Sequence, residues 1–320
     1  MLTLAAIEDA AEIVYRAMRP TPQYAWPVLS EALGRTVWVK HENHTPTGAF
    51  KVRGGLVLLQ GLAEKAPSGT GIISATRGNH GQSLAFAASR LGLACHIVVP
   101  EGNATEKNAA MRAFGANLIE HGPDFDAAKA EAARLAEEQG LTMIPSFHAD
   151  LVRGVATYGL EFFRAVPELD VVYVPIGLGS GICGLISARD ALGLKTKIVG
   201  VVSDKADAYA RSLESGKLTE TASAATFADG MAVRCPDEQA LAMIRAGAED
   251  IVRVSDDQVA DAIRLYYRAT HNVAEGAGAA PLAALMADTE RGKTPGVILC
   301  GQNIDTRWMA EVLGGGTPTP

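Results

Sequence analysis

The sequence lacks the features of disulfide-rich, zinc-binding, membrane-spanning or nucleic-acid-binding proteins. Its four cysteines are far apart and form no C-x-x-C pair, which argues against a disulfide framework or a zinc site and fits a reducing compartment. No apolar run approaches the roughly 20 residues that a membrane-spanning helix requires. A formal net charge of −7 argues against a nucleic-acid or anionic-membrane surface. We therefore expect a cytoplasmic protein without nucleic-acid or membrane partners.

The remaining composition is that of an ordinary globular protein. The 320 residues are 48% hydrophobic and 20% charged, which is enough to bury a sizeable core in one large or two medium domains. The N-terminal segment carries Glu8, Asp9 and Glu12 among its apolar positions, so it predicts an amphipathic helix and not a signal peptide. The glycine- and proline-containing tail at 314–320 is expected to be frayed.

Short apolar runs alternate with longer helical patterns along most of the chain. This alternation predicts an α/β fold of two open, twisted, mostly parallel sheets with helices on both faces. The segment 140–154 separates two series of elements, and predicts a large domain of residues 1–64 and 150–320 and a small domain of residues 65–149. The predicted strands are 71–74, 95–100, 117–120, 171–175, 197–202, 251–254 and 297–300, and the predicted helices are 82–91, 104–114, 126–138, 182–192 and 256–270.

Ligands of parallel sheets bind beyond the carboxyl ends of the strands, where this chain has glycine-containing loops. The first such loop, 74–82, reads SATRGNHGQ. Its glycines, Gly78 and Gly81, would let a ligand approach the backbone at a helix start. The alternative is a plain strand–helix turn in which Thr76 or Asn79 caps the helix. This loop alone leaves both interpretations open.

The second loop, 175–184, reads PIGLGSGICG and places three alternating glycines before a helix. Exposed amides and the Ser180 hydroxyl would suit a phosphate at the helix N-terminus. However, the G-x-G-x-x-G at 179–184 is followed by Asp204 at the end of the next strand. That is the dinucleotide fingerprint with its ribose-binding acid, so an NAD-dependent oxidoreductase is an alternative at this point.

Two further stretches contain candidate reactive groups. Cys300 ends the last predicted strand, although a buried cysteine is more often a small hydrophobic residue. Lys51 follows Phe50 in the glycine-flanked segment 44–55, which we expect to be a strand or a turn. Burial would lower the pKa of the lysine and expose the free base that attacks a carbonyl. The alternative is a solvated lysine near Arg53.

Five motifs, taken together and in order, resemble the fold-type II pyridoxal phosphate enzymes, in particular the serine/threonine dehydratase and serine racemase family. The resemblance covers nearly the whole chain. It implies a tryptophan synthase β-like architecture, with a large cofactor-binding and a small substrate-closing domain, and pyridoxal 5'-phosphate as the cofactor. The motifs are P-T-G-A-F-K-V-R-G at 46–54, G-N-H-G-Q at 78–82, the glycine loop at 177–181, A-D-G-M-A-V at 228–233 and C-G-Q-N at 300–303.

The resemblance implies cofactor contacts for individual residues. Lys51 is expected to bind the cofactor covalently and later to move the α-proton, with Phe50 beside one face of the ring and the backbone of Gly230 beside the other. Asn79 is expected to hydrogen-bond the phenolic oxygen of the ring. Cys300 stands where the family usually has Ser or Thr facing the pyridine nitrogen. The residues expected around the phosphate are Gly177, Leu178, Gly179, Ser180 and Gly181.

The substrate side is implied in less detail. Glu275 matches a family acid near the site. The residues expected around the α-carboxylate are Thr76, Arg77, Gly78, Asn79 and His80. The implied reaction is β-elimination of water from a 3-hydroxy amino acid (threonine, serine, hydroxyaspartate or phenylserine), which yields a 2-oxo acid and ammonia. A β-replacement synthase is the alternative within the family, and a homodimer is the expected assembly.

This chain departs from the family pattern in places that bear on specificity. Arg77 replaces a serine that racemases use as an acid and base, and a guanidinium cannot lose its proton to take that part. The same arginine could bind a second substrate carboxylate or could pair with a protein carboxylate or the phosphate. Val202 and Ala208 stand where metal-activated members have acids, so no metal is expected there.

Overall fold

The structure, a computed structural model, describes residues 2–320 with the exception of 66, 68 and 289. The described strands form a six-stranded sheet in the order β1-β2-β10-β7-β8-β9 and a four-stranded sheet in the order β5-β4-β3-β6. Strand β1 pairs with β2 antiparallel, and the other described pairs are parallel. The strands are β1 (Gln23–Ala25), β2 (Trp38–His41), β3 (Gly71–Ala75), β4 (Ala94–Val99), β5 (Asn117–Glu120), β6 (Thr142–Met143), β7 (Val171–Pro175), β8 (Lys197–Ser203), β9 (Asp250–Val254) and β10 (Pro295–Leu299).

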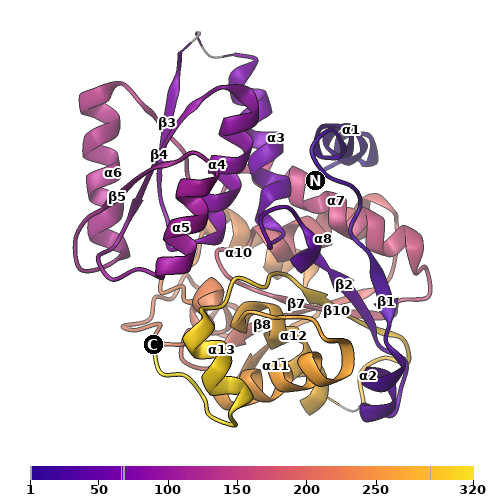
Figure 1. The fold of residues 1–320 in the computed structure, drawn as a ribbon. Coiled ribbons are helices and arrows are strands. Elements are labelled where there is room, and N and C mark those ends of the chain that lie inside the picture. The colour runs from indigo at the N-terminus through magenta and orange to yellow at the C-terminus, as the bar shows by residue number, and fades with distance from the viewer. Residues whose placement is uncertain (1, 66, 68, 289) are drawn as a thin grey trace.

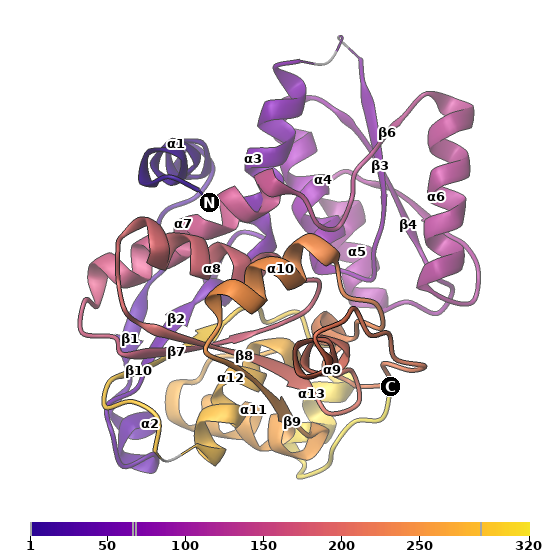
Figure 2. The same cartoon turned by 180° about the vertical axis from the view of Figure 1, so that it is seen from behind.

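Helices cover both faces of each sheet, which explains why the central strands are apolar throughout. On the six-stranded sheet, α7, α8 and α10 lie on one face and α11, α12 and α13 on the other (Figure 1, Figure 2). On the four-stranded sheet, α6 packs on one face and α4 on the other. The helices are α1 (Leu4–Tyr15), α2 (Pro27–Ala32), α3 (Lys51–Ala63), α4 (Asn79–Leu91), α5 (Thr105–Ala113), α6 (Phe125–Gln139), α7 (Ala149–Ala165), α8 (Ser180–Ala191), α9 (Ala208–Ser215), α10 (Glu238–Gly247), α11 (Asp256–Thr270), α12 (Gly276–Ala287) and α13 (Thr306–Leu313).

The two sheets use different parts of the chain. The four-stranded sheet takes its strands from the segment 71–143, whereas the six-stranded sheet joins β1 and β2 to strands that follow β6. In Figure 1 the four-stranded sheet lies above the six-stranded one, and α3 runs beside both α4 and α7. The predicted α/β class with two mostly parallel sheets is confirmed.

Lys51 is helical, so the predicted strand or turn at this position is wrong. The hydroxyls of Thr45 and Thr47 donate to the carbonyl of Ala49, and Gly48 has a left-handed φ of 68°. This tight turn directs the chain straight into α3. The glycines that follow allow close helix packing, because a Cβ at Gly55 would lie 2.2 Å from Ser83 Oγ in α4.

The C-terminal tail is packed, in contrast to the predicted fraying. Arg264 Nη1 in α11 donates to the carbonyls of Val312 and Gly316 at 2.9 and 3.0 Å. The hydroxyl of Thr317 donates to Asp257 at 2.6 Å. The tail therefore continues the packing of α13 against α11, which the sequence pattern does not reveal.

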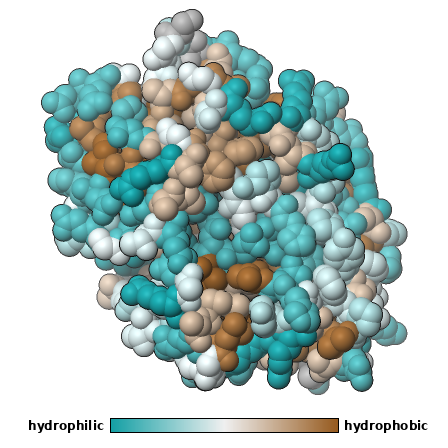
Figure 3. Space-filling model, viewed as in Figure 1, coloured by the Kyte–Doolittle hydropathy of each residue, from teal (hydrophilic) through white to brown (hydrophobic). Residues whose placement is uncertain are grey.

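Across the described residues, every helix is too short or too polar to cross a membrane. On the face shown in Figure 3, hydrophobic residues gather in separate patches among hydrophilic ones.

Candidate active site

Three sequence motifs meet at one small pocket. Lys51 at the start of α3, His80 at the start of α4 and Ser180 at the start of α8 line it. Gly54 and Leu151 complete part of the wall. The beginnings of three helices, from segments far apart in the sequence, therefore converge on the lysine.

Lys51 has the electrostatic surroundings of a reactive amine. Its side chain is partly buried, and burial lowers its pKa, against the opposing effects of Cys300 and Glu275. The ammonium nitrogen lies 4.9 Å from the centroid of the Phe50 ring. Because desolvation outweighs the two acidic groups, a larger share of Lys51 is free base than for a solvated lysine.

Two tyrosine hydroxyls bind backbone carbonyl groups of the glycine loop at the start of α8. Tyr209 donates to the carbonyl of Leu178 at 2.9 Å, and Tyr158 donates to that of Gly181 at 2.8 Å. Gly179 caps α8 with a left-handed φ of 104°. The first amide groups of α8 have no acceptor within the helix, so they are available to an anion.

Close backbone approach explains why glycines occupy this loop. A Cβ on Gly177 would lie 2.3 Å from the carbonyl oxygen of Gly230, and a Cβ on Gly181 would lie 3.4 Å from the ring of Phe50. The loop, Phe50 and Gly230, which the sequence places at three distant positions, are thus neighbours in the structure.

Cys300 directly follows β10 and is 3% exposed. Its carbonyl accepts a hydrogen bond from the backbone N–H of Phe50 at 2.9 Å, which fixes β10 beside the start of α3. Burial, followed by the nearby Glu275, raises the pKa of the Cys300 thiol well above its usual value. The group is therefore a neutral thiol, which is a weak hydrogen-bond donor.

The predicted carboxylate loop, residues 76–80, follows β3. The hydroxyl of Thr76 accepts from the backbone N–H of Gly78 at 3.1 Å, so Thr76 orders the turn, while the helix cap is Gly78 itself. His80 is buried, and burial lowers its pKa to about 3, so the ring is neutral. Arg77 is exposed, and among the described residues its side chain has no hydrogen bond or ion pair.

Two charged residues that the sequence patterns did not indicate border this loop. Lys107, in α5, lies over Gly78, since a Cβ there would be 2.6 Å from its side chain. Its ammonium group pairs with Asp229 from the opposite part of the molecule. Burial lowers the pKa of Lys107, but Asp229 and then Glu275 outweigh this effect and raise it, so the lysine is charged.

Asn79 is connected to residues at the far end of the chain. Its Nδ2 donates to Glu275 Oε1 at 2.7 Å, and its Oδ1 accepts from Asn303 Nδ2 at 2.8 Å. Glu275 is 1% exposed, and burial raises its pKa to about 7 despite the opposing effect of Lys107. Asn303 was not predicted from the sequence, although it belongs to the C-G-Q-N motif.

The two positions where metal-activated family members carry acids are apolar in this chain. Val202 lies in β8 and Ala208 begins α9, and both side chains are buried. Asp204, the acid of the dinucleotide interpretation, is exposed, and its backbone N–H donates to Val254.

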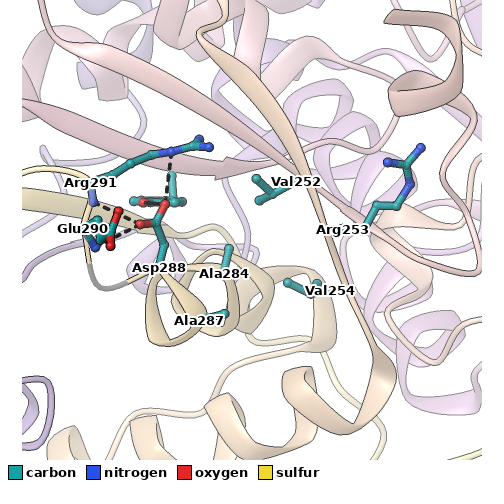
Figure 4. Close-up of a pocket in the computed structure, with 9 residues that line it drawn as sticks. Val252, Arg253, Val254, Ala284, Ala287, Asp288, Glu290 and Arg291 are labelled. Carbon is teal, nitrogen blue, oxygen red and sulfur yellow. Dashed lines mark hydrogen bonds and ion pairs between the residues drawn. The ribbon is translucent and has the colours of Figure 1, made fainter. Parts of the chain in front are cut away.

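A larger cavity, of about 510 Å³, lies elsewhere and contains none of the predicted site residues (Figure 4). Tyr173, strand β9 and the end of α12 line it. Two of its charged residues already compensate each other, because Arg291 pairs with Asp288 and also with Asp250. The small pocket at Lys51, with a reactive amine and converging helix starts, is therefore the better candidate for the active site.

A lysine with a lowered pKa, a glycine loop at a helix N-terminus and a neutral thiol are the groups expected of an enzyme with a phosphorylated carbonyl cofactor. The chain belongs to the family of pyridoxal-phosphate dependent enzymes, whose model matches residues 14–301. The cofactor is therefore pyridoxal phosphate, and the alternative of a nicotinamide cofactor, which the G-x-G-x-x-G at 179–184 suggested, is wrong.

Individual relatives agree with this family. The chain is 33% identical over 312 residues to the biosynthetic L-threonine dehydratase of Haemophilus influenzae. The matched region covers 96% of this chain and 61% of that protein. It is 31% identical over 318 residues to the L-threonine ammonia-lyase of Thermotoga maritima. That match covers 99% of this chain and 79% of the relative. The solved structure of a pyridoxal 5'-phosphate-dependent aspartate racemase superposes with a TM-score of 0.89 at 27% identity, over 96% of this chain and 98% of that one. This chain therefore spans less than two thirds of the Haemophilus enzyme.

The residues present fit the cofactor of this family. The approach of Gly177 to Gly230 leaves no room for a side chain, as expected of a backbone cradle. Lys51 can supply the amine that binds the aldehyde, and the Cys300 thiol can face a ring nitrogen without a charge.

Proposed function

We propose that the protein is a pyridoxal phosphate-dependent dehydratase (ammonia-lyase) that converts a 3-hydroxy amino acid to a 2-oxo acid and ammonia. The carrying observation is the partly buried Lys51, whose pKa is lowered and which shares a pocket with His80 and Ser180. The names of the Haemophilus and Thermotoga relatives favour L-threonine as the first substrate to test.

The residues around the pocket suit this elimination. Lys51 would hold the cofactor through its amine and would accept the α-proton of the substrate. The bound cofactor supplies an electron sink that makes this proton acidic. The Cys300 thiol, a weak donor, would face the pyridine nitrogen without protonating it, and this would favour loss of the β-hydroxyl over transamination. The proton and the hydroxyl leave as water, and the released enamine is then hydrolysed to the 2-oxo acid and ammonia.

Borohydride reduction of the purified enzyme tests the role of Lys51. The cofactor should become fixed to the peptide that contains residue 51, as mass spectrometry would show. Lys51→Ala should remove both the adduct and the elimination of water. A fixed cofactor on any other lysine would refute the assignment.

A second candidate substrate is a 3-hydroxy amino acid with a side-chain carboxylate, such as 3-hydroxyaspartate. The observation that favours it is Arg77, which follows β3 in the predicted carboxylate loop and has no ion pair in the described part of the chain. A guanidinium fork can bind a carboxylate through two hydrogen bonds. The name of the aspartate racemase is support that an acidic amino acid can be bound in this fold.

A substrate panel distinguishes these candidates. Formation of 2-oxo acid should be measured with L-threonine, L-serine, the diastereomers of 3-hydroxyaspartate and phenylserine, for the wild type and for Arg77→Ala. If hydroxyaspartate is preferred and Arg77→Ala removes that preference, the arginine binds the side-chain carboxylate of the substrate. Preference for L-threonine with equal activity in both proteins would identify a neutral substrate.

We also propose that the enzyme acts in the cytoplasm as a homodimer. The acidic net charge and the absence of a membrane-spanning helix among the described residues are compatible with this location. Sedimentation velocity should give twice the mass of one 33.5 kDa chain. A monomer at micromolar concentration would contradict the proposed assembly.

A further inference from the structure

A directed chain of hydrogen bonds ends at Asn79. Asn303, which follows β10, donates from Nδ2 to the carbonyl of Thr47 at 2.9 Å and to Asn79 Oδ1 at 2.8 Å. Asn79 in turn donates from Nδ2 to Glu275 Oε1 at 2.7 Å. The four residues come from four distant segments, and all three bonds are partly buried.

The direction of this chain is fixed at its beginning. A backbone carbonyl can only accept, so Asn303 must turn its amide nitrogen toward Thr47. The second hydrogen of that nitrogen then faces Asn79, which must present its oxygen. The remaining end of the Asn79 amide, its nitrogen, consequently faces the carboxyl group of Glu275. A turned Asn79 amide would place two oxygens against each other at Glu275 and two nitrogens against each other at Asn303.

Gly48 provides the space for this arrangement. A Cβ at Gly48 would lie 2.6 Å from Asn303 Oδ1, and the left-handed φ of 68° favours glycine in any case. The backbone N–H of Gln302 also donates to the carbonyl of Gly48 at 2.9 Å. The turn that precedes Lys51 therefore binds both the side chain of Asn303 and the backbone of its neighbour Gln302.

One hydrogen of Asn79 Nδ2 remains available. The other hydrogen of this nitrogen is donated to Glu275, and among the described residues Nδ2 has no second hydrogen-bond acceptor. Asn79 begins α4 next to His80, which lines the Lys51 pocket. Glu275 accepts this hydrogen bond whether its other oxygen is protonated or not, so the orientation does not depend on its charge.

We infer that Asn303 is a positioning residue that fixes the amide of Asn79 so that an N–H, and not a carbonyl oxygen, faces the phenolic oxygen of the cofactor. This inference rests on the proposed placement of the cofactor beside Lys51. A hydrogen-bond donor at the phenolic oxygen stabilises the oxygen in its anionic form. The nitrogen that would join Lys51 to the cofactor shares a proton with this oxygen, so its affinity for that proton falls. Loss of the donor raises the pKa of the bound chromophore.

The first test is the pH dependence of the visible absorption of the holoenzyme. In Asn303→Asp, the residue facing Asn79 can only accept, which favours the turned amide. Asn303→Ala simply removes the constraint. Both variants should raise the pKa of the chromophore by on the order of one unit, with the larger shift in Asn303→Asp. Gln302→Glu, which introduces the same change one position earlier, should leave the pKa unchanged.

A double-mutant cycle distinguishes positioning from a direct effect. If Asn303 acts through Asn79, Asn303→Ala should shift the chromophore pKa in the wild type and not in the Asn79→Ala background. Equal shifts in both backgrounds, or no shift in either Asn303 variant, would overturn the inference. Should Asn303→Asp fail to fold, the alanine variants complete the cycle without it.

Borohydride trapping on the same preparations separates this inference from the proposed function. Trapping at residue 51 with an unchanged chromophore pKa would reject only the role of Asn303. Failure to trap the cofactor at residue 51 would reject the placement of the cofactor and, with it, the basis of the inference.

Discussion

Arg53 lies two residues after Lys51 and carries a fully buried charge. Its Nε donates to Glu42 at 2.7 Å, and its Nη1 donates to Glu161 at 2.6 Å. Lys40, also fully buried, pairs with Glu161 from the other side, so two cations face two anions. Because these residues come from β2, α3, α7 and the turn after β2, the cluster ties the helix of the reactive lysine to the large sheet.

Removal of the Arg53 side chain should destabilise the protein strongly. Arg53→Ala leaves two buried carboxylates with only Lys40 as a cation, and breaking a buried pair in this way costs about 3–5 kcal/mol. Arg134 offers a matched control, because it also bridges two glutamates, Glu131 and Glu138, but on the solvated surface of α6. Urea unfolding should show a large loss for Arg53→Ala and a midpoint near that of the wild type for Arg134→Ala. Similar midpoints for both variants would contradict this account.

At the scale of elements, α3 and α7 cross at glycines. A Cβ on Gly154 of α7 would lie 2.3 Å from the carbonyl oxygen of Arg53, and a Cβ on Gly54 of α3 would lie 2.9 Å from that of Leu151. These contacts involve backbone atoms, which cannot give way as a flexible side chain can. The crossing therefore depends on glycine, and it sets the distance between the first turn of α3 and α7.

The two helices allow a matched test of this packing. Gly154→Ala should lower the free energy of unfolding by about 1–3 kcal/mol or more, because the added methyl group forces the helices apart. Gly61→Ala, in α3 with no atom within 4 Å of the added Cβ, should be neutral or stabilise by up to about 1 kcal/mol through helix propensity. Thermal and urea unfolding measure both changes. Equal losses would show that the close approach at Gly154 is not the cause.

Strand β2 carries an element-scale pH dependence at His41, which is fully buried. The indole N–H of Trp26 donates to His41 Nε2 at 2.9 Å, so Nδ1 carries the ring proton and faces Asn43 Oδ1 at 3.1 Å. The bond from Trp26 requires the neutral ring, because a protonated Nε2 cannot accept, whereas Nδ1 can donate to Asn43 in either state. Burial, followed by the nearby His44, lowers the pKa of His41 to about 4.

This shift should make the protein less stable in acid. Between the ordinary pKa of about 6.5 and the lowered value, the unfolded chain binds more protons, so stability falls as the pH decreases through this window. Relative to His41→Gln, the wild type should lose on the order of 2–3 kcal/mol of unfolding free energy between pH 7.5 and pH 4. Urea titrations at several pH values measure the difference. Parallel pH profiles for the two proteins would rule out His41 as the source.

The sequence predicts elements better than the contacts between them. The strands at 117–120 and 171–175 and the helix at 256–270 have the expected bounds, because local hydrophobic periodicity determines them. The helices α4 and α8 begin earlier than predicted, since their first turns absorb glycine-loop residues that have no helical pattern. The bond between Asn79 and Asn303 could not be predicted, because it depends on how the two sheets are placed.

At the scale of the molecule, the two sheets are connected by a buried ion pair. Lys107 in α5 belongs with the four-stranded sheet, whereas Asp229 lies in a short helix at 229–231 beside α12. The lysine side chain is 6% exposed. A second pair, Arg234 with Asp126, also joins these two parts, but both of its side chains are largely exposed. The division into a small domain at 65–149 and a large domain remains a prediction.

These two pairs should contribute unequally. Asp229→Asn leaves the buried ammonium of Lys107 without its partner and should lower the free energy of unfolding by on the order of 2 kcal/mol or more. Arg234→Gln should change it by less than about 1 kcal/mol, because exposed pairs are screened by water. Urea unfolding of both holoenzymes measures the contrast. A loss in Arg234→Gln as large as that in Asp229→Asn would show that burial does not govern these contacts.

The pairing of β2 with β10 has a consequence for synthesis of the protein. Trp38 lies opposite Gly296 in parallel register, so β2 stays unpaired on this side until β10, more than 250 residues later, has been synthesised. Until then β2 has an unpaired edge, a configuration that invites pairing with other chains. Cys300 and Asn303 follow β10, so the proposed cofactor site is completed in the same step. The proposed active site therefore forms only after β2 has paired with β10.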